Sequence, residues 1–293
     1  MPTNSPKMSW SQILISFSRV RLCAAVTLSA LTGYIMFTGY FSIEMIYLCI
    51  GVLLLGCGCS ALNQIQEAKT DGIMTRTKNR PIPAGQLQLP MAWFLTTMMI
   101  LGGLYFLACL THHVNLILLL SAFTLFWYNV IYTYMKKWSA YAVFPGAALG
   151  VIPPLMGWLA AGGVWYDKTI ILVSIYFFVW QIPHFWMLLV MHGNDYENAG
   201  LKTMTSLFSK AQFNRLTFVW LMASALIGFL MALFEGMHYY WTIGILLSSI
   251  WLIYTSAKFF LANAPEPLLK KAFLRTVIYN VLIMIFISLN ALL

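Results

Sequence analysis

The stretch IYLCIGVLLLGCGCSALNQIQEAKTDGIMTRTKNR, residues 46–80, combines an apolar run, evenly spaced polar residues and a basic tail. Its first part belongs to an apolar segment over 45–62, which as a helix is long enough to cross a hydrocarbon core of roughly 30 Å. Asn63, Glu67 and Asp71 follow at intervals of four residues, so a continuing helix would present all three on one face. The stretch predicts a membrane-spanning helix that ends in a polar face.

Apolar segments of similar length recur along the whole chain. Of the 293 residues, 61% are hydrophobic and 9% are charged, whereas soluble domains carry roughly 25% charged residues. The composition therefore excludes an ordinary soluble domain and predicts one all-α, polytopic membrane domain over 1–293, which begins with a short amphipathic lead-in on the membrane surface. The nine predicted spans are 22–39, 45–62, 91–110, 115–134, 140–161, 169–190, 216–234, 241–260 and 276–292.

Basic residues alternate with these spans in a way that predicts the orientation. Lys168 is the one basic residue of the 17 that falls on the opposite side from the others. The positive-inside rule places the N-terminus and the long loops 63–90 and 191–215 in the cytoplasm, and a bacterial cytoplasmic membrane is expected. The net charge of +9 is therefore interpreted as a topological signal and not as a sign of nucleic-acid binding.

The first long loop carries the residues of a candidate metal and phosphate site. Mg²⁺ prefers carboxylates, waters and substrate phosphates as ligands, which suits the oxygen atoms of Asn63, Glu67 and Asp71. Nearby basic residues could contact phosphate oxygens, for which the forked guanidinium of Arg is well suited. These residues are Lys69, Arg76, Lys78 and Arg80. An ordinary solvated helix end with i,i+4 ion pairs is the alternative.

The second long loop follows a span that contains polar residues, in the sequence WQIPHFWMLLVMHGNDYENAGLKT over 180–203. Polar residues inside a span usually face a cavity or a partner. The candidates for a second metal-binding or acceptor-binding edge are Gln181, His184, His192, Asn194 and Asp195. A structural role for the histidines is the alternative. Tyr132 and Lys136 form a weaker i,i+4 pair, for which the spacing alone favours a snorkelling lysine.

At these residues the sequence resembles the intramembrane UbiA-type prenyltransferase superfamily, and within it the heme-farnesylating branch. The superfamily pattern Asn-xxx-Asp-xxx-Asp is present as Asn63-xxx-Glu67-xxx-Asp71. The runs that match the heme-farnesylating branch are MTRTKNRPIPAG over 74–85, PGAALGVIPPLMGW over 145–158, WQIPHF over 180–185 and DYENAG over 195–200. The sequence departs from the pattern where Glu67 replaces an Asp and where the second motif lacks the full Asp-xxx-Asp. The second departure leaves the ligands of a second metal open.

The resemblance implies a helical bundle around a central cavity and an Mg²⁺-dependent reaction. A farnesyl group would pass from farnesyl diphosphate to a vinyl group of heme B, and water addition would give heme O. The implied metal ligands are Asn63, Glu67, Asp71, Asn194 and Asp195. The implied diphosphate ligands are Lys69, Arg76, Arg80 and Lys136. The implied catalytic residues are Asp71, Tyr132, Lys136 and His184, and the implied acceptor-binding residues are Gln181, His184 and His192.

Two alternative functions were weighed against this expectation. The first is prenyl transfer to an aromatic or quinone precursor, against which the 180–185 and 195–200 runs argue. The second is transport of a small solute, which would place polar residues near the bilayer midplane, whereas these polar clusters lie at one membrane face. The expected partners are membrane lipid and a heme A synthase or a terminal oxidase under assembly.

Overall fold

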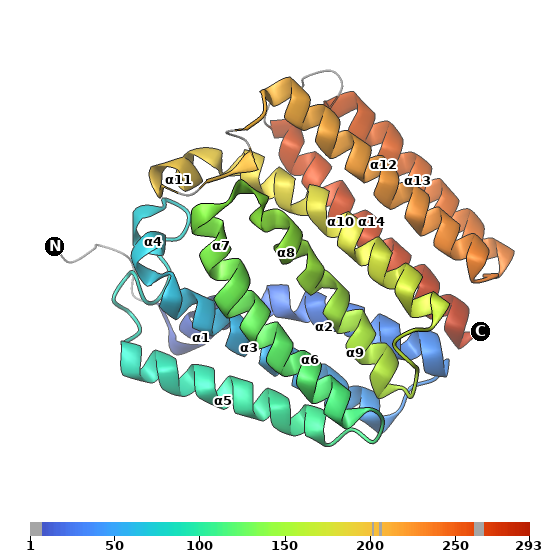
Figure 1. Ribbon diagram of the computed structural model, residues 1–293, viewed down its shortest axis with the longest axis horizontal. Coiled ribbons are helices and arrows are strands. Elements are labelled where there is room, and N and C mark those ends of the chain that lie inside the picture. Colours follow the sequence, from blue (N-terminus) through green and yellow to red (C-terminus); the bar gives the residue numbers. More distant parts are fainter. Residues whose placement is uncertain (1–7, 201, 205–206, 261–266) are drawn as a thin grey trace.

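Nine helices long and apolar enough to cross a membrane are found in the described residues of this computed structural model, which cover 8–200, 202–204, 207–260 and 267–293. The nine predicted spans are confirmed, and no strand occurs in those ranges. The helices run side by side in an elongated bundle (Figure 1). Seven of the spans are made by α2 (Val20–Thr38), α3 (Ile43–Gln66), α5 (Leu89–Ala108), α10 (Lys168–Met191), α12 (Lys210–Phe234), α13 (Tyr239–Phe260) and α14 (Pro267–Leu292).

The fourth and fifth spans are each built from several helical pieces. The fourth consists of α6 (Val114–Phe126), the π-helix η1 (Trp127–Tyr132) and α7 (Thr133–Trp138). The fifth consists of η2 (Ala140–Ala142), α8 (Val143–Ala148), the 3₁₀ turn η3 (Leu149–Val151) and α9 (Ile152–Ala160). Pro153 and Pro154 remove backbone donors at the start of α9, which accounts for the break before it. The sequence predicted both spans as single helices, so these breaks correct it.

Small residues let α2 and α9 approach closely. A Cβ atom added at Gly157 would lie 1.8 Å from the carbonyl oxygen of Ala30, and one at Gly33 would lie 2.0 Å from that of Pro154. No side chain fits at either contact, because the two backbones themselves touch. Such packing of small residues is a principal source of helix association in membranes, where burial from water contributes little.

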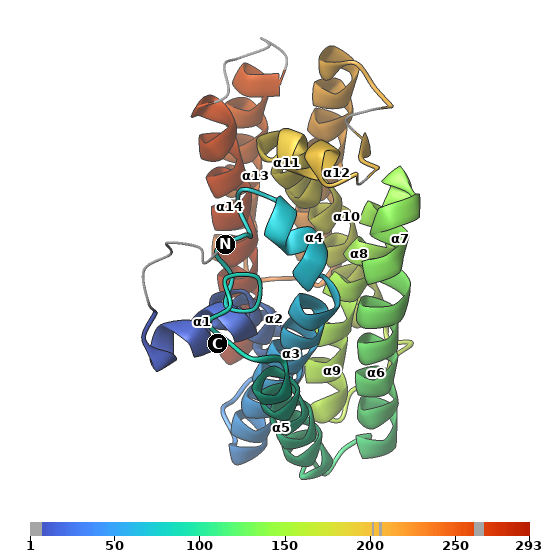
Figure 2. The same cartoon turned by 90° about the vertical axis from the view of Figure 1, so that its left-hand side faces the viewer.

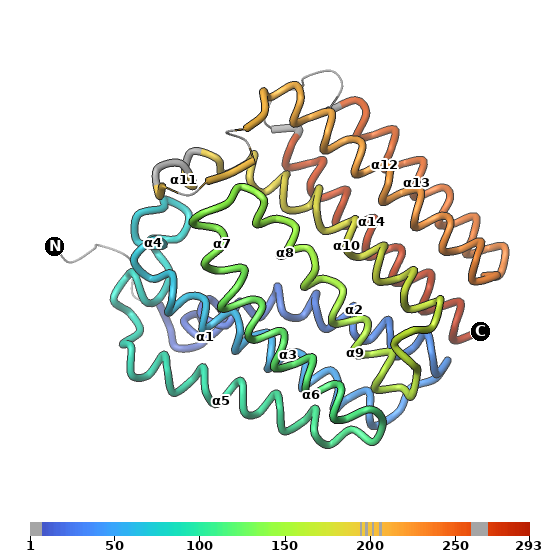
Figure 3. Tube along the Cα trace, in the orientation of Figure 1, coloured from blue at the N-terminus to red at the C-terminus, as the bar shows by residue number. Residues whose placement is uncertain are grey.

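Three short helices gather at one end of the bundle and position the candidate site. They are α4 (Ala68–Ile73), α7 and α11 (Gly193–Asn198), which lie near one another in both views (Figures 1 and 2). The chain trace shows the segments after α3 and after α10 converging there (Figure 3). The first helix, α1 (Trp10–Ser18), lies across the neighbouring edge, as expected for an amphipathic lead-in. The two long loops predicted from the sequence therefore meet at the same end.

Candidate active site

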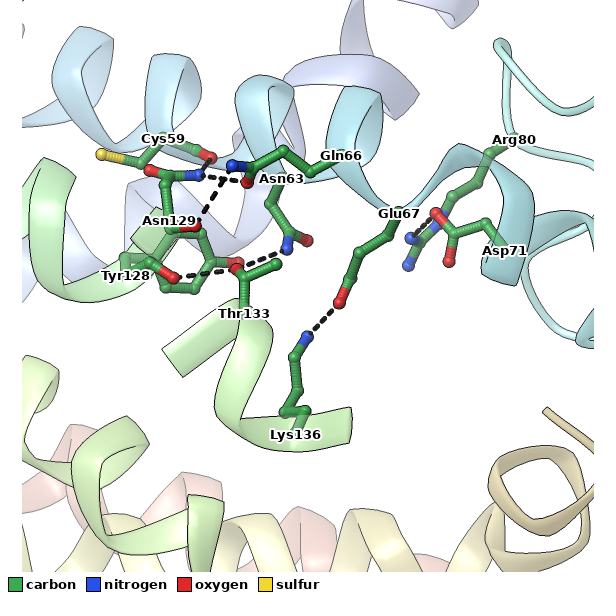
Figure 4. A network of polar contacts seen from close by, with 10 residues as sticks. All are labelled: Cys59, Asn63, Gln66, Glu67, Asp71, Arg80, Tyr128, Asn129, Thr133 and Lys136. Carbon is green, nitrogen blue, oxygen red and sulfur yellow. Dashed lines mark hydrogen bonds and ion pairs between the residues drawn. The ribbon is translucent and has the colours of Figure 1, made fainter. Parts of the chain in front are cut away.

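The carboxylate motif spans a break between α3 and α4, across which the i,i+4 backbone hydrogen bonds are kept. Asp71 lies in the first turn of α4, beyond a break between α3 and α4 at Glu67, where φ is −97°. The backbone N–H of Glu67 donates to the carbonyl of Asn63 at 2.9 Å, and that of Asp71 donates to the carbonyl of Glu67 at 2.8 Å. The i,i+4 spacing is therefore kept across the break, and the three side chains lie along one side (Figure 4). The sequence predicted the shared face and missed the break.

Each carboxylate of this motif holds one cation. The Asp71 carboxylate accepts from the Arg80 guanidinium at 2.5 Å, and the Glu67 carboxylate lies 2.7 Å from the Lys136 ammonium. Asp71 is only 1% exposed, so its charge is compensated inside the protein and not by water. Lys136 reaches Glu67 from α7, 69 residues along the chain, so the first loop and the fourth span share one polar cluster (Figure 4).

Asn63 supplies an unused oxygen to the same face. Its amide Nδ2 donates to the Thr133 hydroxyl at 3.0 Å, and that hydroxyl donates to the carbonyl of Tyr128 at 2.8 Å. Its Oδ1 atom is buried and has no hydrogen-bond partner among the described residues. A buried polar atom without a partner is costly, and such atoms often mark a ligand or ion site. The residues therefore fit a metal cation that takes oxygen atoms as ligands. No three His, Cys, Asp or Glu side chains form a metal cluster in the described part of the chain.

A π-helix fixes the position of Tyr132 and Lys136. Within η1 the Asn129 amide donates to the carbonyl of Cys59 at 3.0 Å, and the Gln66 amide donates to the carbonyl of Asn129 at 3.1 Å. The extra residue of a π-turn rotates the following side chains, and such turns often occur at functional sites. Lys136 lies 4.9 Å from the centre of the Tyr132 ring, so the weak sequence signal for this pair belongs to the cluster. No periodicity in the sequence identified η1.

Arg19 is a member of this cluster that the sequence analysis counted only as a topological charge. It joins α1 to α2 with φ +50°, a backbone conformation unusual for a residue with a long side chain. Burial by itself lowers the pKa of its guanidinium. Nearby Tyr128, Asp71 and Glu67 raise the pKa by more than burial lowers it, so the net shift is upward. Burial and the neighbouring Arg19 charge lower the pKa of Arg80. This left-handed backbone lies at the start of the first span, where the Arg19 charge is within electrostatic reach of the two carboxylates.

Two predicted diphosphate ligands point elsewhere. Lys69 and Arg76 are exposed, whereas Arg80 is largely buried against Asp71. The backbone N–H of Arg76 donates a hydrogen bond to Asp195. Burial and the positive charge of Arg76 lower the pKa of His192. Of the four predicted diphosphate ligands, the structure brings Arg80 and Lys136 to the carboxylates and leaves Lys69 and Arg76 at the surface.

Asp195 ties the second loop to the first. Its two carboxylate oxygens accept from the backbone N–H groups of Thr75 at 3.2 Å and Arg76 at 3.1 Å. Desolvation raises the pKa of this carboxyl, but the hydrogen bonds from Arg76 and Thr75 together outweigh it and lower the pKa. In the described part of the chain its hydrogen bonds go to these residues of the first loop and not to the Asn63 face. The side chain of Asn194, another predicted ligand, lies outside the described residues.

His184 lies in an aromatic enclosure on α10. Its ring centre is 4.9 Å from that of Trp180 and 4.8 Å from that of Phe273. Its Nδ1 atom is buried without a partner among the described residues. The next residue, Phe185, stacks on Tyr132 with ring centres 6.5 Å apart, which connects this enclosure to the carboxylate cluster.

Gln181 and His192 flank this enclosure. A Cβ atom at Gly150 would lie 3.2 Å from the Oε1 atom of Gln181, so the glycine in η3 makes room for that side chain. His192 ends α10, one residue before α11 begins.

The chain belongs to the UbiA prenyltransferase family, whose family description matches residues 22–277. Among curated relatives, the protoheme IX farnesyltransferase of Oleidesulfovibrio alaskensis is 40% identical over 186 residues, which cover 64% of this chain and 65% of the relative. That of Geobacter sulfurreducens is 38% identical over 194 residues, which cover 66% of this chain and 70% of the relative. The matches therefore span about two thirds of these relatives' length.

Solved structures show the same fold. A digeranylgeranylglyceryl phosphate synthase superposes with a TM-score of 0.77 at 14% identity, over 97% of this chain and 99% of that one. A UbiA homolog from Archaeoglobus fulgidus bound to GPP and Mg²⁺ superposes with a TM-score of 0.65 at 12% identity, over 94% of this chain and 99% of that one. The all-α membrane architecture expected from the sequence is confirmed.

Proposed function

We propose that this chain transfers a farnesyl group from farnesyl diphosphate to a vinyl group of heme B, with addition of water, to give heme O and diphosphate. The observation that carries the prenyl-transfer step is the shared face of Asn63, Glu67 and Asp71. Its two carboxylates form ion pairs with the side chains of Arg80 and Lys136. The heme acceptor is supported by the names of the curated relatives, protoheme IX farnesyltransferase. The 180–185 run, which builds the His184 enclosure, adds support.

Magnesium fits the carboxylate face. The unpartnered oxygen of Asn63 and the carboxylates of Glu67 and Asp71 are hard oxygen ligands of the kind that Mg²⁺ takes together with substrate phosphates. When bound, the metal would neutralise charge that develops on the diphosphate leaving group. Asp195 remains a predicted ligand of a second metal, to be tested against its loop-bridging contacts.

The cations of the cluster are placed to bind the diphosphate. Lys136 and Arg80 each hold a carboxylate through a pair that a divalent cation would compete for, so both could turn to phosphate oxygens as the metal takes the carboxylates. Arg19 adds a third positive charge in the field of the same groups. Positive groups arranged before the reaction stabilise charge on a leaving oxygen without further reorganisation.

The reaction balances without an additional oxidant or reductant. The bond between the first farnesyl carbon and the diphosphate oxygen breaks, and the oxygen keeps the electron pair. The heme vinyl group supplies the electrons of the new carbon–carbon bond, and water adds to the cation left on the vinyl carbon and loses a proton. The rings of Tyr128, Tyr132 and Phe185 stack between the carboxylate cluster and the His184 enclosure. The π faces of such rings stabilise an allylic cation. The free Nδ1 atom of His184 is available to the acceptor or to the proton.

The test uses membranes that contain the protein, supplied with Mg²⁺, farnesyl diphosphate and heme B. We expect heme O by mass spectrometry, and no product when EDTA is present. A parallel reaction with 4-hydroxybenzoate in place of heme tests the aromatic-acceptor alternative. Prenylation of that acid with no heme O formed would replace the proposed acceptor.

The two histidines can be separated in the same assay. His184→Phe keeps an aromatic ring in the enclosure and removes its nitrogen atoms, so we expect heme O formation to fall about 10²-fold, within the range of an acid–base residue. His192→Ala, at the half-buried C-terminal end of α10, is expected to have a smaller effect. Full activity of both variants would contradict a role for either histidine.

The membrane and the partners are part of this proposal. We expect the protein in a bacterial cytoplasmic membrane with the carboxylate cluster on the cytoplasmic side, which cysteine labelling at Lys202 from either side of intact cells would test. The product suits a heme A synthase or a terminal oxidase under assembly, and co-purification with either would test that partnership.

A further inference from the structure

The amphipathic helix α1 is attached to the bundle on one face and open on the other. Ile13 and Phe17 are buried against Ala61, Leu87 and Ala92, which fixes the helix at the bundle edge. A capping box closes its start, where Ser9 and Gln12 bond to each other's backbone. The helix is therefore a fixed element, and its outward face is a defined surface.

The open face of α1 mixes exposed apolar side chains with exposed polar ones and borders a groove. The side chain of Trp10 is 61% exposed and that of Ile15 is 46% exposed. Large exposed apolar side chains on an amphipathic helix are typical of a helix lying in the headgroup region of a bilayer, where Trp is enriched. A groove of about 780 Å³ runs between this face and the start of α2, with Ile15 and Leu22 on its apolar side.

The polar side of the groove carries positive charge without a carboxylate. Gln12, Ser16, Arg19 and Arg21 contribute to its lining, and among the residues that the structure describes no acidic side chain does. Arg19 lies in the field of Asp71 and Glu67, so its charge is engaged by the active site. Arg21 is exposed and makes neither an ion pair nor a hydrogen bond within the described residues. The groove thus offers one uncompensated guanidinium beside exposed aliphatic side chains.

We propose that this groove binds the phosphodiester headgroup of an anionic phospholipid, with Arg21 on the phosphate and the acyl chains against Ile15 and Leu22. A guanidinium matches phosphate oxygens in geometry and charge. The groove combines that guanidinium with an apolar wall beside α1. A phospholipid would contact both, whereas a free anion would contact the guanidinium and not the apolar wall. The groove shares Arg19 with the proposed diphosphate site, but the lipid contact assigned to Arg21 does not depend on the proposed reaction.

The test is native mass spectrometry of the full chain in detergent, titrated with phosphatidylglycerol or with phosphatidylcholine carrying the same oleoyl chains. We expect the first phosphatidylglycerol to bind about fivefold more tightly than phosphatidylcholine, the size expected for one basic side chain at an interface. Arg21→Gln should abolish this preference. Lys137→Gln, which removes a positive charge at the same end of the bundle but outside the groove, should keep it.

A second variant covers the case in which Arg21→Gln does not fold. Gln12→Glu keeps the capping box with Ser9 and adds a negative charge to the groove, so it should also abolish the preference. Circular-dichroism melting in the same detergent checks the fold of each variant. Equal binding of the two lipids by the unmodified chain, or equal losses in Arg21→Gln and Lys137→Gln, would overturn the proposal. Displacement of the lipid by inorganic phosphate would assign the groove to a free anion instead.

Discussion

The two loops at the active end differ in how they hold their acidic residues. In the first loop Asp71 is 1% exposed and is bonded to Arg80, and Glu67 is bonded to Lys136 from another span. In the second loop the carboxylate oxygens of Asp195 accept hydrogen bonds from the backbone N–H groups of Thr75 and Arg76, and the Thr75 side chain adds a further hydrogen bond. Carboxylates whose Arg and Lys partners could be replaced by a metal ion suit binding of a metal and a diphosphate. A carboxylate that is hydrogen-bonded to backbone N–H groups suits the ordering of a loop. The difference indicates that the two halves of the site do different work.

Asp71→Asn should produce the largest effect of any substitution that breaks this comparison. Asn keeps the shape and removes the negative charge, so the face loses a predicted metal ligand and Arg80 loses its partner. We expect kcat/KM for heme O formation to fall about 10²–10³-fold, as for loss of one group that stabilises transition-state charge. Stability in detergent should also decrease, since a buried guanidinium is left unpaired. Steady-state assays and thermal unfolding measure the two effects separately.

Lys136→Met should have the next largest effect. It removes the ammonium that holds Glu67 and keeps the length of the aliphatic chain, so we expect a fall in kcat/KM of about 10–10²-fold, the value of one charge-assisted hydrogen bond. Lys137→Met is the matched control, because its ammonium lies over the Tyr134 ring and touches no carboxylate. Similar losses in the two variants would show that the charge matters and not the contact with Glu67.

Arg19→Gln tests the residue that the sequence analysis did not place in the site. We expect about a tenfold rise in KM for farnesyl diphosphate with a smaller change in kcat, because a ligand to the diphosphate contributes to binding in ground and transition states. Lys69→Gln removes an exposed charge from α4 and should change KM little. If Lys69→Gln raises KM more than Arg19→Gln does, the structural assignment is wrong and the sequence prediction is right.

Asp195→Asn should have the smallest effect on chemistry, with kcat/KM changed less than about threefold at neutral pH. Its pKa is lowered in the folded protein, so its contribution to the loop contact is present above about pH 3.9, the ordinary carboxyl value, and is lost as pH falls through the lower folded value. The protection factors for hydrogen exchange at the amides of residues 75 and 76, corrected for the intrinsic pH dependence of exchange, should therefore decrease at low pH. The same amides should exchange faster at neutral pH in the variant, and unchanged exchange would show that Asp195 does not order this loop.

Much of the fold could be predicted from the sequence because hydropathy acts locally. Seven of the nine spans were located within about four residues by length and apolarity, whereas α12 and α14 begin six and nine residues before their predicted starts. The clustering of both long loops at one end followed from alternation of the spans. The spacing of Asn63, Glu67 and Asp71 likewise placed three side chains on one face, and the structure shows that face.

The remaining features depend on contacts between distant residues. The bond from Asn63 to Thr133 crosses 70 residues, and the π-helix that presents Lys136 is fixed by Gln66 and Asn129 across 63. Arg19 resembled any basic residue before a first span, and only its left-handed backbone and the carboxylates around it distinguish it.

The measurement that tests the central claim most directly is calorimetric binding of a non-hydrolysable thiolo analogue of farnesyl diphosphate, with and without Mg²⁺. The unmodified chain and Asp195→Asn should bind the analogue with similar affinity and only when Mg²⁺ is present. Asp71→Asn, shown to be folded by its thermal unfolding, should lose most of that Mg²⁺-dependent binding. Undiminished Mg²⁺-dependent binding by Asp71→Asn, together with its loss in Asp195→Asn, would contradict the account and move the diphosphate site to the second loop.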